Sequence, residues 1–419
     1  MPQRLIQSHS YFFFPLILSG LIVIAILPVW WVLGAAAYPI AEWSHSTFNA
    51  VIANLIAFSV ANLFFRRFER YPQFNAVSFI LPILLTVFSI SLAVLFVLRL
   101  DYSVKILFLG LLITFVYMCV QHVLLNRSKH ITLHLVPYGE ALDFKSSGHY
   151  SFKLMQQPKH TVSNIHGVVA DMHGDTLSAE WQKFLCECAL RNIPVYNAIQ
   201  LKETLTGKVN VQHLIANHFG GLSPSGIFFV CKRIIDIIFL VLTAPITIPL
   251  MLLLALMIKL DSPGAALFIQ PRVGLGGKVF RLVKFRSMHV HVPGAHFTSD
   301  EQDARITRVG RVIRKYRLDE LPQFWNVLKG EMSLIGPRPE SVELAKWYET
   351  EVPFFAYRHV VRPGISGWAQ VMHGYAAGVE DVKDKLAYDF YYIKHFSLWL
   401  DLLIWYKTIK TVFTGYGSR

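Results

Sequence analysis

Four long apolar runs fill the first third of the chain, and they constrain its fold more than any other feature. They lie at Tyr11–Leu33, Thr47–Phe65, Val77–Leu98 and Val104–Leu125. Each run has about the 20 residues that a membrane-spanning helix needs. The whole chain is 53% hydrophobic, which is more than soluble proteins usually are. We therefore expect residues 1–130 to form an α-helical bundle of four transmembrane helices.

The positive charges around these runs predict their orientation. Basic residues lie at Arg4, at 66–70 and at 127–129, all of which four crossings would place on one side. The opposite loops carry only Arg99 and Lys105. Because basic loops stay in the cytoplasm, both ends of the bundle are predicted to be cytoplasmic. The charge pattern thus predicts a multi-pass membrane protein whose polar second half lies on the cytoplasmic side.

The composition becomes more polar over residues 131–222, and this segment is predicted to be a small α/β domain. Short strand-like segments lie at 131–139, 166–172 and 192–198, with a helical pattern at 179–191. Such alternation is typical of a parallel, Rossmann-like sheet. The first strand ends in the single glycine Gly139, without the G-x-G-x-x-G turn that binds phosphates. A regulatory or structural role is therefore favoured over cofactor binding.

A fifth apolar run, Ile234–Ile258, has basic residues at both ends and two prolines, Pro245 and Pro249, near its centre. Proline removes a helical N–H and favours a bend. We interpret residues 232–260 as a helix that enters the membrane, bends and returns to the same side. A full span is the alternative, but it would place all later residues outside the cell.

The charge of the chain limits its partners. It has 40 Lys and Arg against 27 Asp and Glu, a net charge of +13. Such an excess favours anionic partners, namely lipid head groups, phosphorylated substrates or nucleic acid. The sequence has neither zinc-finger spacing nor an aromatic RNA-binding motif, so nucleic acid is not expected as a partner. Membrane lipid and phosphorylated substrates remain.

A basic amphipathic helix is predicted from residue 305 to residue 317. Arg305, Arg308, Arg311 and Arg314 recur every three residues, and apolar residues fill the other face. A helix of this kind commonly lies on anionic lipid, which is the expected role of most of these arginines. Arg314 lies nearest to a following pair of carboxylates, so it is the candidate for binding a substrate phosphate.

Two adjacent carboxylates, Asp319 and Glu320, follow the basic helix. Acidic residues at the start of a helix are often simple caps. An ionised aspartate could instead act as a nucleophile toward phosphorus, while the glutamate binds Mg²⁺. Lys284 and Arg286 end a strand-like segment upstream. They lie either at a solvated strand end or beside the same anionic site.

Several motifs in the second half of the chain then identify a resemblance. They are KRIID at 232–236, KLDSPG at 259–264, KFRSM at 284–288, LDELPQFWNVLKGEMSLIGPRP at 318–339, RPGISGWAQV at 362–371 and the segment from Tyr388 to Asp401. In this order they resemble the bacterial sugar transferase domain of the monotopic phosphoglycosyl transferase superfamily. The complete layout resembles the large members that initiate exopolysaccharide synthesis. The resemblance implies an α/β monotopic catalytic domain over residues 223–419.

The resemblance also implies a reaction. The family transfers a sugar 1-phosphate from a UDP-sugar to a polyprenyl phosphate such as undecaprenyl phosphate, and it releases UMP. Asp319 matches the nucleophile and Glu320 the residue linked to Mg²⁺, whereas Pro249 matches the proline of the re-entrant turn. Pro245 is additional to the usual pattern. The phosphate-binding candidates are Arg314, Lys284, Arg286, Arg338 and Arg362.

Two functions of other classes are weighed against this enzyme. A transporter usually places ionisable residues inside its spans, and the four apolar runs have almost none. A non-catalytic scaffold of a polysaccharide assembly complex would not need the Asp319–Glu320 pair. The expected sugar is glucose or galactose, with N-acetylated sugars less favoured. The product would start an exopolysaccharide, a capsule or an O-antigen. A homo-oligomer is left open.

Overall fold

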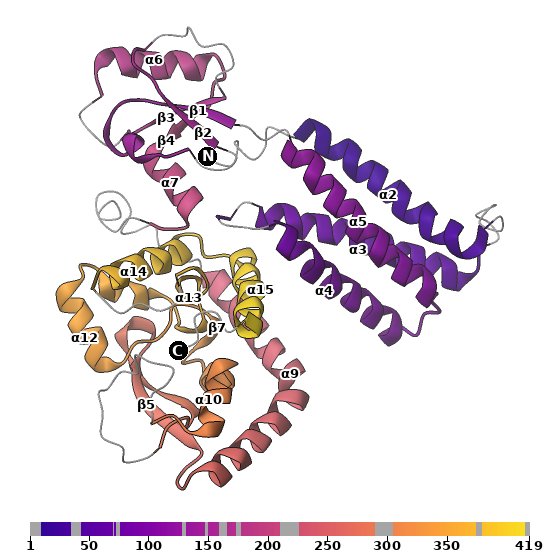
Figure 1. Cartoon of the computed structure of the whole chain (residues 1–419), viewed down its shortest axis with the longest axis vertical. Coiled ribbons are helices and arrows are strands. Elements are labelled where there is room, and N and C mark those ends of the chain that lie inside the picture. The colour runs from indigo at the N-terminus through magenta and orange to yellow at the C-terminus, as the bar shows by residue number, and fades with distance from the viewer. Residues whose placement is uncertain are drawn as a thin grey trace. The chain divides into compact units, whose positions relative to one another are not determined.

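The protein is described here from a computed structural model (Figure 1). The structure describes residues 10–34, 43–69, 71–72, 76–127, 131–146, 150–158, 166–172, 177–209, 226–289, 305–373 and 379–414. The chain divides into two compact units, Met1–Gly207 and Lys208–Arg419. The boundary lies somewhat before the expected start of the catalytic domain at residue 223.

Four long helices open the first unit, each where the sequence predicts an apolar run. They are α2 (Ser10–Leu33), α3 (His45–Phe68), α4 (Ala76–Val97) and α5 (Val104–Arg127). All contain a stretch that is long and apolar enough to cross a membrane. One polar contact between helices of the bundle is that of Asn54 of α3, which donates to the Ile106 carbonyl of α5 at 3.0 Å. A helical membrane protein is thus confirmed, whereas the crossing of each helix stays a prediction.

The rest of the first unit is a four-stranded parallel sheet of order β2-β1-β3-β4. Its elements are β1 (Ile131–Leu135), η3 (Gly139–Asp143), β2 (Tyr150–Leu154), β3 (Gly167–Ala170), α6 (Ala179–Leu190), β4 (Val195–Asn197) and α7 (Ala198–Thr206). The three predicted strands and the helix at 179–191 are confirmed. Strand β2 was not predicted, because its YSFKL segment is short and lies at the sheet edge.

Gly139 is required by a tight turn rather than by a phosphate. Its φ is +55°, a region that side chains disfavour, and an added Cβ would lie 2.3 Å from the Asp171 carboxylate. That carboxylate accepts the Glu140 backbone N–H at 3.1 Å. An anion would meet a carboxylate at this strand end. The geometry agrees with the structural or regulatory role that the sequence favours.

The second unit begins with the long helix α9 (Gly226–Asp261). It continues with β5 (Leu267–Val273), η4 (Leu275–Gly277), β6 (Val279–Phe285), α10 (Arg308–Lys315), η5 (Leu318–Gln323), α11 (Phe324–Lys329), β7 (Ser333–Ile335), α12 (Val342–Glu351), η6 (Phe355–Val360), β8 (Gly364–Ser366), α13 (Trp368–Met372), α14 (Val379–Lys394) and α15 (Leu398–Thr414). Strands β5 and β6 form an antiparallel hairpin, and β7 pairs with β8 in parallel.

Helix α9 is continuous through Pro245 and Pro249, and it changes direction near its middle (Figure 1). Most of its apolar side chains are exposed there, including Val241, Leu242 and Ile246. Of its apolar run only 11% is buried, which suits a lipid environment. An apolar run of this length with so many exposed side chains would be costly in free energy if water surrounded it.

Both ends of α9 are attached to the same globular core. In its first half, Lys232 forms an ion pair with Asp401 of α15 at 2.5 Å, and Asp236 accepts the Ser333 hydroxyl of β7 at 2.6 Å. At its last residue, Asp261 accepts the Val309 backbone N–H of α10 at 3.1 Å. A straight helix of 36 residues would be about 54 Å long, so contacts at both ends favour a bent path.

The core beneath the site is made where α9, β6, α10 and η5 meet. Leu254, Ile258, Phe285 and Ile313 are buried together there. The apolar face predicted for the basic helix is therefore divided, since Ile313 packs inside whereas Val312 is 55% exposed.

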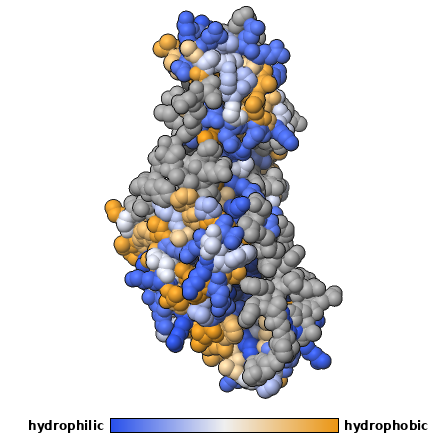
Figure 2. Space-filling model, turned by 90° about the vertical axis from the view of Figure 1, so that its left-hand side faces the viewer, coloured by the Kyte–Doolittle hydropathy of each residue, from blue (hydrophilic) through white to orange (hydrophobic). Residues whose placement is uncertain are grey.

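Apolar side chains reach the surface in several places in the view of Figure 2. On β5 the exposed ones are Leu267, Phe268 and Ile269.

Candidate active site

The carboxylate pair lies on the short helix η5, directly after a strained residue. Arg317 has φ +54°, the left-handed region that costs a non-glycine residue about 1 kcal/mol or more. The chain can then place Leu318 and Leu321 against the core of Phe285 and Ile313. Asp319 and Glu320 lie between these two anchors, so packing of the leucines fixes the position of both carboxylates.

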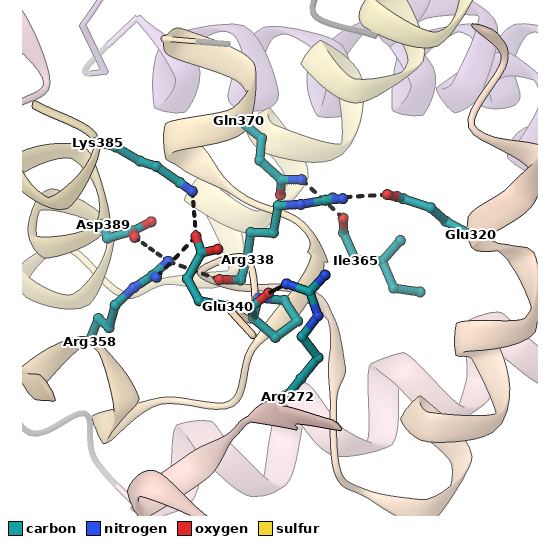
Figure 3. Close-up of polar contacts among 10 residues, drawn as sticks. Arg272, Glu320, Arg338, Glu340, Arg358, Ile365, Gln370, Lys385 and Asp389 are labelled. Atoms are coloured by element: carbon teal, nitrogen blue, oxygen red, sulfur yellow. Dashed lines mark hydrogen bonds and ion pairs between the residues drawn. The ribbon is translucent and has the colours of Figure 1, made fainter. Parts of the chain in front are cut away.

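Glu320 is held by an ion pair. Its Oε1 lies 2.9 Å from Nη1 of Arg338, which comes from the Gly-Pro-Arg-Pro turn after β7 (Figure 3). The Glu320 side chain is only 10% exposed. Burial alone would raise the pKa of Glu320, but the charges of Arg338 and Arg317 lower it below its usual value. Glu320 is therefore an anion at neutral pH.

Asp319 has the opposite shift. Burial and the neighbouring charge of Glu320 raise the pKa of Asp319 to about 6. The cations of Lys284, Arg338 and Arg314 oppose this rise. A carboxyl group with such a pKa would be mostly ionised at pH 7. Ionisation of Asp319 stays a prediction, and the surroundings of Asp319 raise its pKa instead of lowering it.

Two of the predicted phosphate-binding cations reach the pair from neighbouring elements. Lys284 lies near the end of β6, with its Nζ 5.1 Å from the centre of the Phe268 ring across the hairpin. Burial lowers the pKa of Lys284, and the charge of Asp319 partly restores it. Arg314 lies in the last turn of α10, close enough for its charge to act on Asp319. A basic setting therefore surrounds the carboxylates.

Two other predicted cations lie elsewhere. Arg286 is buried, and its guanidinium donates to the Pro263 carbonyl at 2.7 Å and the Ser262 carbonyl at 2.6 Å, just after α9 ends. It satisfies backbone acceptors there and is not brought to the carboxylates. Arg362 donates from Nε to the Gly330 carbonyl at 3.1 Å. Arg286 was expected at a solvated strand end or beside the anionic site, and Arg362 was a candidate for phosphate binding, but both guanidinium groups donate to backbone carbonyls.

The sequence reasoning missed Arg317 as a site residue. Burial lowers the pKa of Arg317, while the carboxylates of Glu320 and Asp319 oppose this effect. Only its place two residues before Asp319 could have drawn attention to it. The left-handed backbone that directs it cannot be seen in the sequence.

A second charged cluster beside the Arg338 turn was also missed (Figure 3). It comprises Arg272 of β5, Glu340, Arg358 of η6, and Lys385 and Asp389 of α14. These residues come from four separate segments. No sequence motif links them, which is why only the fold reveals the cluster.

The carboxylates of Asp319 and Glu320 are the side chains of this site that could hold a magnesium ion. Asp319 and Glu320 repel each other, and a divalent cation near them would relieve that repulsion. Mg²⁺ is usually bound through one or two carboxylates together with substrate phosphates and water. No cluster of three or more His, Cys, Asp or Glu that could hold a metal alone occurs among the described residues. The donor set therefore suits a phosphate-bridged ion.

Comparison with known proteins adds an independent line of argument. The family model for bacterial sugar transferases matches residues 227–415. The UDP-N-acetylgalactosamine-undecaprenyl-phosphate N-acetylgalactosaminephosphotransferase of Aeromonas hydrophila is 46% identical over 384 residues, which cover 90% of each chain. Two proteins named UDP-glucose:undecaprenyl-phosphate glucose-1-phosphate transferase are similar over 198 residues. That of Caulobacter vibrioides is 42% identical, covering 46% of this chain and 74% of its own, and that of Escherichia coli is 40% identical, covering 46% and 42%.

Proposed function

Since the chain belongs to the bacterial sugar transferase family, we propose that it transfers a sugar 1-phosphate from a UDP-sugar to undecaprenyl phosphate and releases UMP. The observation that carries the proposal is the buried carboxyl group of Asp319, on whose charge the cations of Lys284, Arg338 and Arg314 act. A carboxylate among cations can approach a pyrophosphate that would otherwise repel it. The relatives that share this part of the chain bear the corresponding names.

In the proposed mechanism, Asp319 acts as a nucleophile. Its carboxylate attacks the phosphorus that bears the sugar, the bond from that phosphorus to the UMP oxygen breaks, and UMP leaves. An aspartyl phosphosugar remains. A phosphate oxygen of undecaprenyl phosphate then attacks the same phosphorus, which forms a pyrophosphate link to the lipid and frees Asp319. Two such displacements replace one difficult transfer.

The other residues would act on charge and position. The cations of Lys284, Arg338 and Arg314 would neutralise the phosphates and stabilise the charge that develops in each displacement. Glu320, held by Arg338, would stay ionised beside the nucleophile. We propose that Glu320 helps to hold Mg²⁺, which would supply charge neutralisation for the pyrophosphate.

The relatives differ in the sugar donor that their names give. The relative that aligns over 90% of both chains is named for N-acetylgalactosamine, whereas relatives that share only the second half are named for glucose. We therefore propose an N-acetylated UDP-hexose as the first donor to test, with UDP-glucose and UDP-galactose as the alternatives. The lipid-linked product would begin an exopolysaccharide, capsule or O-antigen repeat unit.

For topology, we propose that α9 is re-entrant and that the catalytic unit lies on the cytoplasmic side of the inner membrane. The bend at the prolines and the attachment of both helix ends to one core support this path. A substrate that is a soluble nucleotide and an acceptor that is a lipid would then meet at the membrane surface.

A donor panel tests the proposed function. Membranes or purified full-length protein are incubated with undecaprenyl phosphate, Mg²⁺ and either UDP-N-acetylgalactosamine, UDP-N-acetylglucosamine, UDP-glucose or UDP-galactose. The expected result is stoichiometric UMP and lipid-linked sugar with one or two donors. Absence of UMP release with every donor, from protein that is folded, would favour the alternative of a non-catalytic scaffold.

A further inference from the structure

The charged cluster of Arg272, Glu340, Arg358, Lys385 and Asp389 lies beside the active site but includes none of the proposed catalytic groups. Arg358 and Asp389 are almost completely buried, with 2% of each side chain exposed, and they lie 2.7 Å apart. Lys385 reaches Glu340 at 2.6 Å. Burying so many charges costs free energy that an apolar core would not require. The cluster therefore calls for an explanation beyond packing.

The cluster is connected to the active site through backbone atoms. Nη2 of Arg358 donates to the carbonyl of Arg338 at 2.9 Å, and Nη1 of Arg272 donates to the carbonyl of Pro339 at 3.1 Å. The carboxylate of the next residue, Glu340, forms ion pairs with Lys385 and Arg358. Three consecutive residues are thus each fixed by a side chain from another element.

The turn itself has little freedom to rotate. Pro337 and Pro339 flank Arg338, and proline fixes its own φ while restricting the residue before it. Once the carbonyl of Arg338 is held, the Cα–Cβ bond from which its side chain starts has a defined direction. That direction leads to Glu320, which Arg338 contacts at 2.9 Å (Figure 3).

We propose that Arg358 is a positioning residue, which aims Arg338 at the carboxylate pair by holding the Arg338 carbonyl. Arg358 itself contacts neither Glu320 nor Asp319 through any described hydrogen bond or ion pair. Arg272 assists by holding the next carbonyl of the turn. The role in catalysis rests on the proposed function, whereas the aiming of Arg338 at Glu320 does not.

The first test needs no activity. Thermal unfolding of the full-length protein in detergent is measured for Glu320→Gln, Arg338→Met and the double variant, with Arg358 intact and again with Arg358→Lys. With Arg358 intact, the two changes should be non-additive by about 3 °C, because they break one ion pair. The non-additivity should disappear with Arg358→Lys. Its persistence would overturn the proposal, and so would its absence from the protein with Arg358 intact.

The second test measures kcat with the donor that the panel identifies. Arg358→Lys keeps the charge but cannot hold a carbonyl and two carboxylates together, so kcat should fall about 10- to 100-fold. In an Arg338→Met background, Arg358→Lys should lower kcat by less than about twofold, because the guanidinium that Arg358 positions is absent. Equal losses in both backgrounds would show a merely structural role and overturn the proposal.

A matched control and a second variant keep the test decisive. Arg286→Lys is the same substitution at another buried arginine, whose guanidinium donates to the carbonyls of Pro263 and Ser262, so the factor by which it changes kcat should be equal in both backgrounds. If Arg358→Lys does not fold, Arg272→Met removes the hydrogen bonds of Arg272 to the Pro339 carbonyl and to Gln270 but leaves Arg358 in place, and it should show the same dependence on Arg338. If the protein with no substitution releases no UMP, the proposed function fails, while the unfolding test still decides the positioning.

Discussion

Glu340 should make a measurable contribution to stability that depends on pH. Its side chain is 10% exposed and pairs with Lys385 and Arg358. Although burial would raise the pKa of Glu340, these cations lower it from 4.5 to about 2. A difference of about 2.5 pH units from the unfolded chain corresponds to about 3 kcal/mol of stability at neutral pH.

The sign of the pH dependence follows from the lowered pKa. Stabilisation by ionised Glu340 is fully present above the unfolded pKa of 4.5 and is lost as the pH falls toward about 2. Glu340→Gln should therefore lower the free energy of unfolding by about 3 kcal/mol at pH 7. At pH 3.5 the difference should shrink to about 2 kcal/mol. At this pH Glu340 of the unsubstituted protein already binds a proton in the unfolded state, whereas it is still ionised in the folded state.

Thermal or denaturant unfolding of the full-length protein in detergent provides the assay, followed by tryptophan fluorescence at several pH values. Glu349→Gln is the matched control, since this residue is exposed on α12 in the same unit. It should change stability by less than about 0.5 kcal/mol at every pH. A Glu340→Gln variant as stable as the control at pH 7 would refute the reasoning, as would a difference that grows with acidity.

Three further predictions concern metal, domains and topology. Excess chelator should abolish UMP release and Mg²⁺ should restore it, while Glu320→Gln should lower the rate and weaken the metal response; full activity in chelator would refute the Mg²⁺ proposal. A chain shortened to begin at Lys208 should keep its activity in detergent, because every proposed catalytic residue lies in the second unit; inactivity of a folded short chain would show that the first unit contributes to catalysis. A single cysteine at Ser418 should be inaccessible to an impermeant reagent in intact cells, and replacing Pro245 and Pro249 with leucine should expose it by favouring a straight helix. Labelling of the chain with its prolines intact would contradict the re-entrant path.

The elements that the sequence predicted well are those with strong local patterns. The apolar runs became α2 to α5, and the buried strands 131–139, 166–172 and 192–198 became β1, β3 and β4. The hydrophobic pattern that predicts such a helix or strand can be recognised from neighbouring residues alone. The short edge strand β2 lacks such a pattern, since its residues are only partly buried.

The residues of the candidate site also fall into two groups, those that a local motif predicts and those that only the fold brings together. Asp319, Glu320 and Lys284 were predicted from local motifs, and the fold brings their charges together. The motif around Arg286 could not show that its guanidinium would be used by the backbone after α9. Arg358 could not be predicted either, because its partners lie in two other segments, the turn at 338–340 and α14. Long-range contacts between buried charges have no signal along the chain.

The central claim is that Asp319 becomes covalently bound to the phosphosugar. The most direct measurement incubates the full-length protein with donor labelled in the phosphate that bears the sugar, without lipid acceptor, and then quenches it with denaturant. We expect UMP up to one equivalent per chain and label on the peptide that contains Asp319. It also predicts that undecaprenyl phosphate discharges the label and that Asp319→Asn gains none. Substantial turnover by Asp319→Asn, or an unlabelled protein that releases UMP only when acceptor is present, would contradict it.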